Sequence, residues 1–299
     1  MAYHVPVLLR ESVDALSVVA DGVYVDATFG GGGHSRELLR VLGEHARLFV
    51  FDQDADAQKN ALDDKRLVFV QSNYAFLKNF LSFYEVDGVH GVLADLGVSS
   101  HHFDTPERGF SFRFDSRLDM RMNSSAGKSA YDVLNTYSCE DLTRVFREYG
   151  ELRQAYSLAR AICESREAKP LETTFDLKNI GLKFFSPKQE NKLLSQLFQA
   201  IRIEVNNEME SLKRFLKAGL DVLLPGGRFV IITYHSLEDR LVKNFFKSGN
   251  FEGLIEKDFF GKSIVPFEQI TRKPIIPSVV EMQENSRSRS AKLRIVQKK

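Results

Sequence analysis

Residues 22–34 read Gly22-Val-Tyr-Val-Asp-Ala-Thr-Phe-Gly-Gly-Gly-Gly-His34, an apolar run that passes directly into four consecutive glycines. The run predicts a strand that ends at Asp26, followed by a helix from Ser35 to Leu42. Glycines between a strand and a helix let the backbone approach a ligand closely and present N–H groups at a helix N-terminus. A plain tight turn is the alternative, but the strand–glycine–helix context favours nucleotide binding.

The rest of the first hundred residues continues this alternation of short apolar runs and helical patterns. Such alternation is typical of βαβ units, and therefore of a parallel sheet with helices on both faces. Further strands are predicted over 47–52, 66–70 and 89–95, and helices over 55–62 and 76–83.

A helical segment interrupts the strand pattern between about Thr105 and Leu216. Ser138 and Ser186 each begin a capping-box pattern for a helix within it. After this segment, residues 228–234 form an apolar run typical of a buried parallel strand, so the sheet resumes there. We therefore predict an α/β domain made of residues 1–104 and 217–299, with residues 105–216 as an inserted all-helical domain and a last strand near the C-terminus.

The composition is that of an ordinary globular protein. Of 299 residues 43% are hydrophobic and 27% charged, and 41 basic against 40 acidic residues give a net charge of +1. Nucleic-acid binding would therefore need a local basic surface. Cys139 and Cys163 are too few for a disulfide framework, which indicates a reducing, cytoplasmic compartment. We expect no signal peptide, and no run approaches the roughly 18 apolar residues of a membrane span.

The acids near the glycines indicate which cofactor the loop would hold. Asp26 stands four residues before Gly30, as in methyltransferases that use S-adenosylmethionine, whereas the dinucleotide pattern is met only with Ser35 in the last glycine position. Asp52, at the end of the second strand, is placed to accept hydrogen bonds from both ribose hydroxyls. The alternative is that Asp52 or Asp54 caps the following helix.

Two more strand ends carry polar side chains toward the same edge of the sheet. Asp95 ends the fourth strand, at a position where methyltransferases acting on exocyclic amines usually carry an acid or an amide. Tyr234 and His235 follow the fifth strand and are expected in the same crevice, because parallel sheets bind ligands beyond the carboxyl ends of their strands. Ser236 and Asp239 have the spacing of a capping box for the next helix.

The loop after the fourth strand contains two adjacent histidines, His101 and His102, near Asp104. Neighbouring side chains in a loop point apart and no further ligand set appears, so we expect no metal site. The segment Arg108–Arg121 then interleaves aromatic residues with four arginines, as a protein that binds an unpaired RNA base would. Alternatively, its phenylalanines pack under the helical insertion. A second basic stretch near the C-terminus, residues 287–294, is most simply a solvated face.

These motifs together resemble the bacterial 16S rRNA (cytosine-N4) methyltransferases, the RsmH/MraW family, over nearly the whole chain. The motifs, in order, are His4-Val-Pro-Val-Leu8, Asp26–Ser35, Asp95–Ser100, Arg108-Gly-Phe-Ser-Phe112, Asp119-Met-Arg-Met122, Tyr149-Gly-Glu151, Phe198–Asn206, His235–Arg240 and Arg287-Ser-Arg-Ser290.

The resemblance implies a class I, Rossmann-like methyltransferase fold with an inserted helical domain. It also implies S-adenosylmethionine as methyl donor and a cytidine of the decoding centre of 16S rRNA, in the small ribosomal subunit, as acceptor. The family's cofactor positions correspond here to Gly32, Gly33, His34, Asp52, Tyr74, Asp95 and His102. Family members often carry Phe in place of Tyr74 and Gln in place of His102.

Either the carboxylate of Asp95 or a backbone carbonyl of the Leu96-Gly97 turn could hydrogen-bond the amine of cytosine. Asp95 is the first catalytic candidate, and Tyr234 and His235 are lesser ones. Two other classes of protein share some of these features. A nicotinamide oxidoreductase would use the same glycine loop and Asp52, and would bind NAD but not S-adenosylhomocysteine. A non-catalytic ribosome-binding factor would use the Arg108–Arg121 segment and leave the small subunit unaltered.

Overall fold

The structure is a computed structural model that describes residues 6–97 and 105–299. It divides into two compact units, residues 1–97 with 209–299, and residues 98–208. The sequence placed the second boundary near Leu216, whereas helix α10 (Glu208–Val222) belongs almost entirely to the first unit. The reason is its apolar face, because Leu212 and Phe215 are buried in the core on one side of the sheet.

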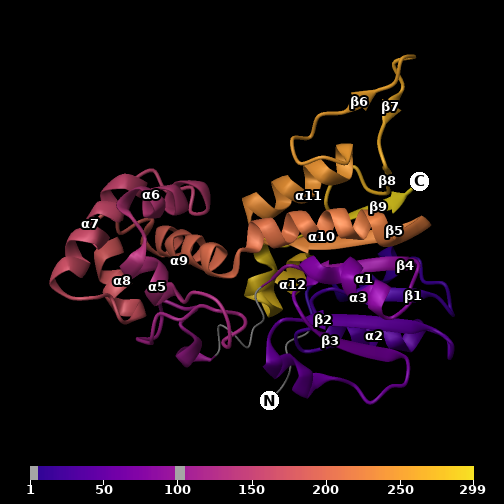
Figure 1. Ribbon diagram of the computed structural model, residues 1–299, viewed down its shortest axis with the longest axis horizontal. Helices are drawn as coiled ribbons and strands as arrows, with labels where there is room; N and C mark the ends of the chain where they lie inside the picture. The colour runs from indigo at the N-terminus through magenta and orange to yellow at the C-terminus, as the bar shows by residue number, and fades with distance from the viewer. Residues whose placement is uncertain (1–5, 98–104) are drawn as a thin grey trace. The chain divides into compact units, whose positions relative to one another are not determined.

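A seven-stranded sheet forms the centre of the first unit, in the order β3-β2-β1-β4-β5-β9-β8 (Figure 1). The first five strands in this order are parallel, and β9 and β8 are antiparallel to their neighbours. The predicted class I, Rossmann-like sheet is therefore confirmed. The bounds are β1 Val23–Asp26, β2 Arg47–Asp52, β3 Leu67–Gln71, β4 Val89–Asp95, β5 Leu223–Thr233, β8 Phe267–Gln269 and β9 Lys292–Lys298.

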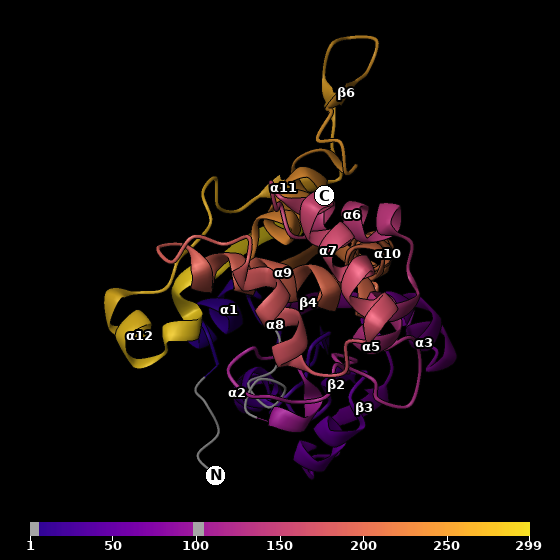
Figure 2. The ribbon, with the colours of Figure 1, turned by 90° about the vertical axis from the view of Figure 1, so that its left-hand side faces the viewer.

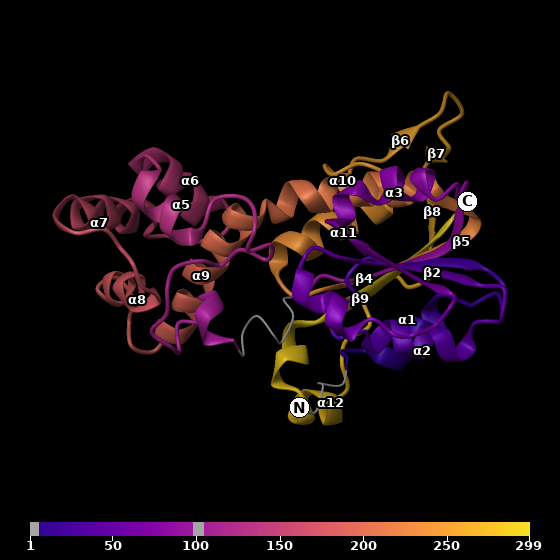
Figure 3. The same ribbon diagram turned by 60° about the horizontal axis from the view of Figure 1, so that its bottom comes forward.

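Helices cover both faces of this sheet (Figure 3). Successive strand residues alternate between the two cores: Phe49 packs with α3 (Leu77–Phe83), α10 and α11 (Ser236–Ser248), whereas Leu48 packs with α1 (Leu9–Ala15) and α2 (Gly33–Val41). This two-sided burial explains the almost unbroken apolar runs of the central strands. The short helix α12 (Val279–Glu284) and the 3₁₀ turn η4 (Ser286–Ser290) precede β9.

The second unit is helical and has a core of its own. Its helices are α5 (Ala130–Thr136), α6 (Cys139–Glu148), α7 (Ala155–Ala168), α8 (Thr174–Leu182) and α9 (Glu190–Asn206), after a 3₁₀ turn η3 (Pro106–Arg108). Helices α6 and α7 lie side by side (Figure 2). Ser138 caps α6 as predicted, with its side chain accepting from the Asp141 N–H at 3.0 Å.

Two predicted helices differ from the structure, and three short strands were missed. Residues 55–62 form the 3₁₀ turn η1 (Ala55–Asn60), with the side chain of Asp54 accepting from the N–H of Asp56. Helix α9 starts at Glu190 and not at Pro187, because Gln189 closes a turn onto the Ser186 carbonyl. The strand β8 and the hairpin β6 (Glu256–Lys257) with β7 (Ser263–Ile264) were missed, since two or three residues are too few to show alternation. None of the described helices is long and apolar enough to cross a membrane.

Candidate active site at the carboxyl edge of the sheet

The glycine loop between β1 and α2 takes a backbone conformation that favours glycine. Gly30 and Gly32 have φ of +52° and +73°, and Gly32 is the N-cap residue of α2. A Cβ at Gly32 would lie 2.8 Å from the ring of Phe29, whereas a Cβ at Gly30 would meet no atom of the described residues within 4 Å. The loop is therefore tightly packed at Gly32 and faces open space at Gly30, where a ligand can approach the backbone.

Gly33 and His34, both expected at the cofactor, also hold the N-terminal segment. A Cβ at Gly33 would overlap the ring of Pro6, so glycine leaves room for that residue. The buried ring of His34 places Nε2 3.2 Å from the carbonyl oxygen of Val7. Both residues therefore have a structural role, and their role at the cofactor stays a prediction.

Asp26 ties the end of β1 to the start of α2. Its carboxylate is only 1% exposed and accepts from the Ser35 hydroxyl at 2.6 Å and from the Thr28 N–H at 3.1 Å. Burial raises the pKa of Asp26, although the charge of His34 and the Ser35 hydrogen bond oppose the rise. Asp26 therefore shapes the loop from inside the fold.

Asp52 binds the same loop from the neighbouring strand. Its Oδ2 accepts from the Gly30 N–H at 2.8 Å, and its Oδ1 accepts from the Asp54 N–H at 2.8 Å. Asn60 supports the loop from the other direction by donating to the Gly30 carbonyl at 3.0 Å. The sequence left open whether Asp52 or Asp54 caps the following helix. The structure shows that Asp54 caps the 3₁₀ turn η1, whereas the half-buried carboxylate of Asp52 lies beside the glycines.

Asp95 and Tyr234 lie next to each other at the ends of β4 and β5. A Cβ at Gly97 would be 3.3 Å from Asp95 Oδ1, and this Oδ1 accepts from the Gly97 N–H at 3.2 Å. A Cβ at Gly97 would lie 2.7 Å from the Tyr234 ring, so glycine permits this close approach. The Asp95 N–H in turn donates to Thr28 Oγ1 at 2.7 Å, which links this pair to the glycine loop.

Burial governs the protonation of this pair. It raises the pKa of Asp95, against the charge of His34 and the neighbouring Tyr234 hydroxyl. The pKa of Tyr234 lies well above its usual value, because of burial first and the negative charge of Asp95 second. The phenol therefore keeps its proton near neutral pH.

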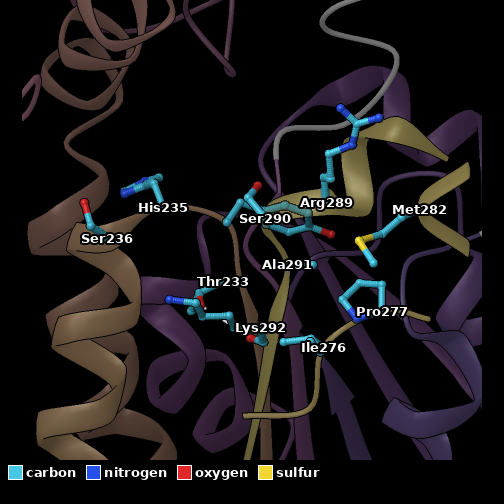
Figure 4. A pocket seen from close by; sticks show the side chains of 11 residues that line it. Thr233, His235, Ser236, Ile276, Pro277, Met282, Arg289, Ser290, Ala291 and Lys292 are labelled. Atoms are coloured by element: carbon cyan, nitrogen blue, oxygen red, sulfur yellow. Dashed lines mark hydrogen bonds between the residues drawn. The ribbon is translucent and has the colours of Figure 1, made fainter. Parts of the chain in front are cut away.

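His235 serves as the N-cap residue of α11. Its Nε2 lies 3.0 Å from Oε1 of Glu238, while Oε2 of Glu238 accepts from the Tyr234 N–H at 2.9 Å. The predicted capping pair of Ser236 and Asp239 was therefore one residue out of register. Figure 4 shows the His235 ring directed away from Ile276, Pro277 and Met282. Glu238, which the sequence analysis missed, is the residue that fixes both His235 and the backbone of Tyr234.

The remaining cofactor candidates lie in different settings. Tyr74 follows β3, in the 3₁₀ turn η2 (Tyr74–Phe76), and its ring packs on Phe215 of α10 with centroids 4.9 Å apart. His102 lies outside the described residues, as do His101 and Asp104.

The Arg108–Arg121 segment turns much of its predicted binding surface inward. Arg108 donates to the carbonyl oxygens of Arg121 and Met122 at 2.9 and 3.0 Å, and Phe110 is only 5% exposed. Phe112 packs on Phe198 of α9 with centroids 5.5 Å apart. The exposed members are Arg113, Phe114, Asp115 and Arg117.

Comparison with known proteins identifies the family. The chain matches the model of the MraW methylase family over residues 1–299. It is 56% identical to "Ribosomal RNA small subunit methyltransferase H" of Parabacteroides distasonis over 297 residues, which cover 99% of this chain and 97% of that protein. The protein of the same name from Flavobacterium johnsoniae is 55% identical over 298 residues, 100% and 98% of the two chains. A solved rRNA methylase from Streptococcus thermophilus aligns over 100% and 98% of the chains with a TM-score of 0.44 and 13% identity, too distant to add to the assignment. The chain belongs to the MraW methylase family.

Proposed function

We propose that this protein methylates the exocyclic N4 amine of a cytidine in the decoding centre of 16S rRNA, with S-adenosylmethionine as donor. Methylation of small-subunit rRNA follows from the names of relatives that share more than half of the sequence over its full length. The atom and its place in the rRNA are our finer proposal. The proposed methyl transfer is supported by one observation: the Gly30 loop, Asp52 and the Asp95–Tyr234 pair lie together at the same edge of the sheet.

The donor side of the proposed site is the glycine loop with Asp52. The open space at Gly30 lets a ligand approach the backbone, and the half-buried Asp52 carboxylate can accept from ribose hydroxyls. Gly32, Gly33, His34, Tyr74, Asp95 and His102 complete the proposed cofactor set. Bound there, S-adenosylmethionine would supply an electrophilic methyl group. The amine lone pair forms the new C–N bond as the C–S bond breaks, the electron pair of the C–S bond stays on sulfur, and the methylated amine releases one proton to water.

The acceptor side is Asp95, held by Tyr234. The amine of cytosine is a poor nucleophile because its lone pair delocalises into the ring. A carboxylate that accepts one amine hydrogen bond favours the tetrahedral nitrogen and orients its lone pair. Asp95 is the proposed catalytic residue and Tyr234 keeps its carboxylate in place. His235, engaged with Glu238, acts in this proposal through the position of Tyr234.

The two units have separate roles in this proposal. The sheet unit is the methyltransferase domain, and the helical unit is an insertion that helps to hold rRNA of the small ribosomal subunit. The exposed Arg113, Phe114 and Arg117 are the side chains of its Arg108–Arg121 segment that could contact phosphates and bases.

A transfer assay tests the function. Small ribosomal subunits from cells that lack this gene are incubated with the protein and methyl-labelled S-adenosylmethionine, and the rRNA is digested to nucleosides. We expect the label in N4-methylcytidine. Label in another nucleoside would refute the proposed atom, and no label in subunits or in free rRNA, with the donor shown to bind, would refute the RNA substrate.

A further inference from the structure

A hollow lies beside Tyr234, where β5 ends and β9 begins. It has a volume of about 280 Å³ and is lined by residues from the end of β5 to the start of α11, from the loop before α12 and α12, and from η4 to the start of β9. Figure 4 shows Ile276, Pro277 and Met282 along one side of this hollow, and Arg289 and Ser290 along a different side. We call it the Arg289 pocket. All its lining residues belong to the sheet unit.

The Arg289 pocket combines an apolar wall with an exposed cation. Ile276, Pro277 and Met282 supply the wall, and Ile276 is 63% exposed although it is a large aliphatic residue. Arg289 is exposed, whereas the neighbouring Lys292 binds Oδ2 of Asp239 at 3.1 Å. Lys292 is thus paired with an acid, and Arg289 presents its guanidinium at the surface.

The size of the pocket limits what it can hold. Sites for small molecules usually measure roughly 300–1,000 Å³, so this pocket has room for a single ring system and not for a complete cofactor. An apolar wall suits the face of a planar base, and an arginine suits a phosphate, which its parallel N–H groups bind in two places. A single nucleotide offers both groups at once.

The side chain of Tyr234 lies between the pocket and Asp95, where we propose that methyl transfer takes place. Tyr234 lines the pocket, and its ring lies next to Gly97, as does Oδ1 of Asp95. An RNA strand that presents a cytidine at Asp95 therefore has its neighbouring nucleotide within reach of this pocket.

We propose that the Arg289 pocket binds a nucleotide of the rRNA strand adjacent to the target cytidine, with its base on the Ile276–Met282 wall and its phosphate on Arg289. This inference rests on the proposed function. The C-terminal segment before β9 would thus take part in substrate binding. It would recognise the base face and the phosphate that all nucleotides share, and it would not distinguish one base from another.

The experiment compares Arg289→Ala and Ile276→Ser with Arg272→Ala. Arg272 is an exposed arginine of the same C-terminal region that does not line the pocket, so it controls for the loss of one positive charge. Equilibrium binding to small subunits from cells that lack the gene is measured over a series of salt concentrations. Binding of S-adenosylhomocysteine is measured in parallel by calorimetry.

We expect Ile276→Ser to weaken binding of the subunit by about tenfold, because an isoleucine side chain buried against a base contributes roughly 1.5 kcal/mol. Arg289→Ala should weaken it and lower the slope of log Kd against log salt by about 0.7, the value for one phosphate contact on a single strand. Arg272→Ala should change neither, and the affinity for S-adenosylhomocysteine should stay constant in all three variants.

Wild-type binding and salt dependence in Arg289→Ala and Ile276→Ser would overturn the inference. A loss of S-adenosylhomocysteine binding would also overturn it, because the pocket would then belong to the donor. Failure of the proposed function is distinguishable, since the wild-type protein would then leave the subunits unlabelled whatever these variants do.

Discussion

The carboxyl edge of the sheet and the Arg108–Arg121 segment use their charged side chains in opposite ways. At the edge, burial dominates and raises the pKa of Asp26 and Asp95, which accept hydrogen bonds from backbone and hydroxyl groups. In the segment, the pKa of Asp119 is lowered. Burial alone would raise it, but two hydrogen bonds from the Arg121 side chain, at 3.0 and 2.7 Å, outweigh the effect of burial. Charged residues in a motif that predicts binding can therefore be available to a ligand, or they can stabilise the loop to which they belong.

Removal of Asp26 should give the largest loss of stability. Asp26→Ala leaves the Ser35 hydroxyl and the Thr28 N–H without their acceptor inside the fold, which should cost about 3 kcal/mol. Asp119→Ala should cost about 1 kcal/mol, because the Asp119 and Arg121 side chains are partly exposed to water. Urea unfolding of both variants measures the difference, and equal losses would contradict the contrast between the two regions.

Asp52 should affect the donor more than the fold. Asp52→Ala removes the proposed acceptor of the ribose hydroxyls and the bond to the Gly30 N–H, so the affinity for S-adenosylhomocysteine should fall by about tenfold to a hundredfold. Asp54→Ala is the matched control, since Asp54 caps η1 and should change stability with little effect on affinity. Calorimetric titration decides between them; the same affinity loss in both variants would make Asp52 a structural residue only.

The two regions should also differ in pH dependence. Because the folded-state pKa of Asp119 lies below its unfolded value of about 3.9, its stabilisation is present above that pH and is lost as the pH falls through the folded pKa. The folded-state pKa of Asp26 lies above its unfolded value. The contribution of Asp26 to the free energy of unfolding therefore changes in the opposite direction and falls as the pH rises through the folded-state pKa. Urea unfolding at several pH values, for Asp119→Asn and Asp26→Asn against the wild type, should therefore show differences in free energy that move in opposite directions.

The smallest expected effects concern the exposed arginines of the segment. Arg113→Ala and Arg117→Ala should each weaken binding of the small subunit a few-fold and lower its salt dependence, with unchanged thermal stability. Arg108→Ala should instead lower the thermal stability, because Arg108 donates to two backbone carbonyls within the segment. Arg113 and Arg117 variants with wild-type affinity would restrict the segment to its structural role.

Sequence analysis predicted best where one strong pattern determines local structure. The buried strands from β1 to β4, and the glycines and acids that follow them, have a period and a position that leave few alternatives. The capping of α11 was misplaced because Ser236 and Asp239 have the same spacing as His235 and Glu238, and only the tertiary pairing of Asp239 with Arg294 and Lys292 separates the two choices. Assignment of α10 to the sheet unit likewise depends on packing that no local pattern shows.

The most direct test of the account is single-turnover methyl transfer by Asp95→Asn, at saturating S-adenosylmethionine, on small subunits from cells that lack the gene. The substitution keeps the size of the side chain and removes the carboxylate that we place at the amine. We predict a rate about a hundredfold below that of the wild type, with Tyr234→Phe in between because Asp95 then loses only its hydroxyl partner. A wild-type rate for Asp95→Asn would contradict the account and remove Asp95 from the catalytic site.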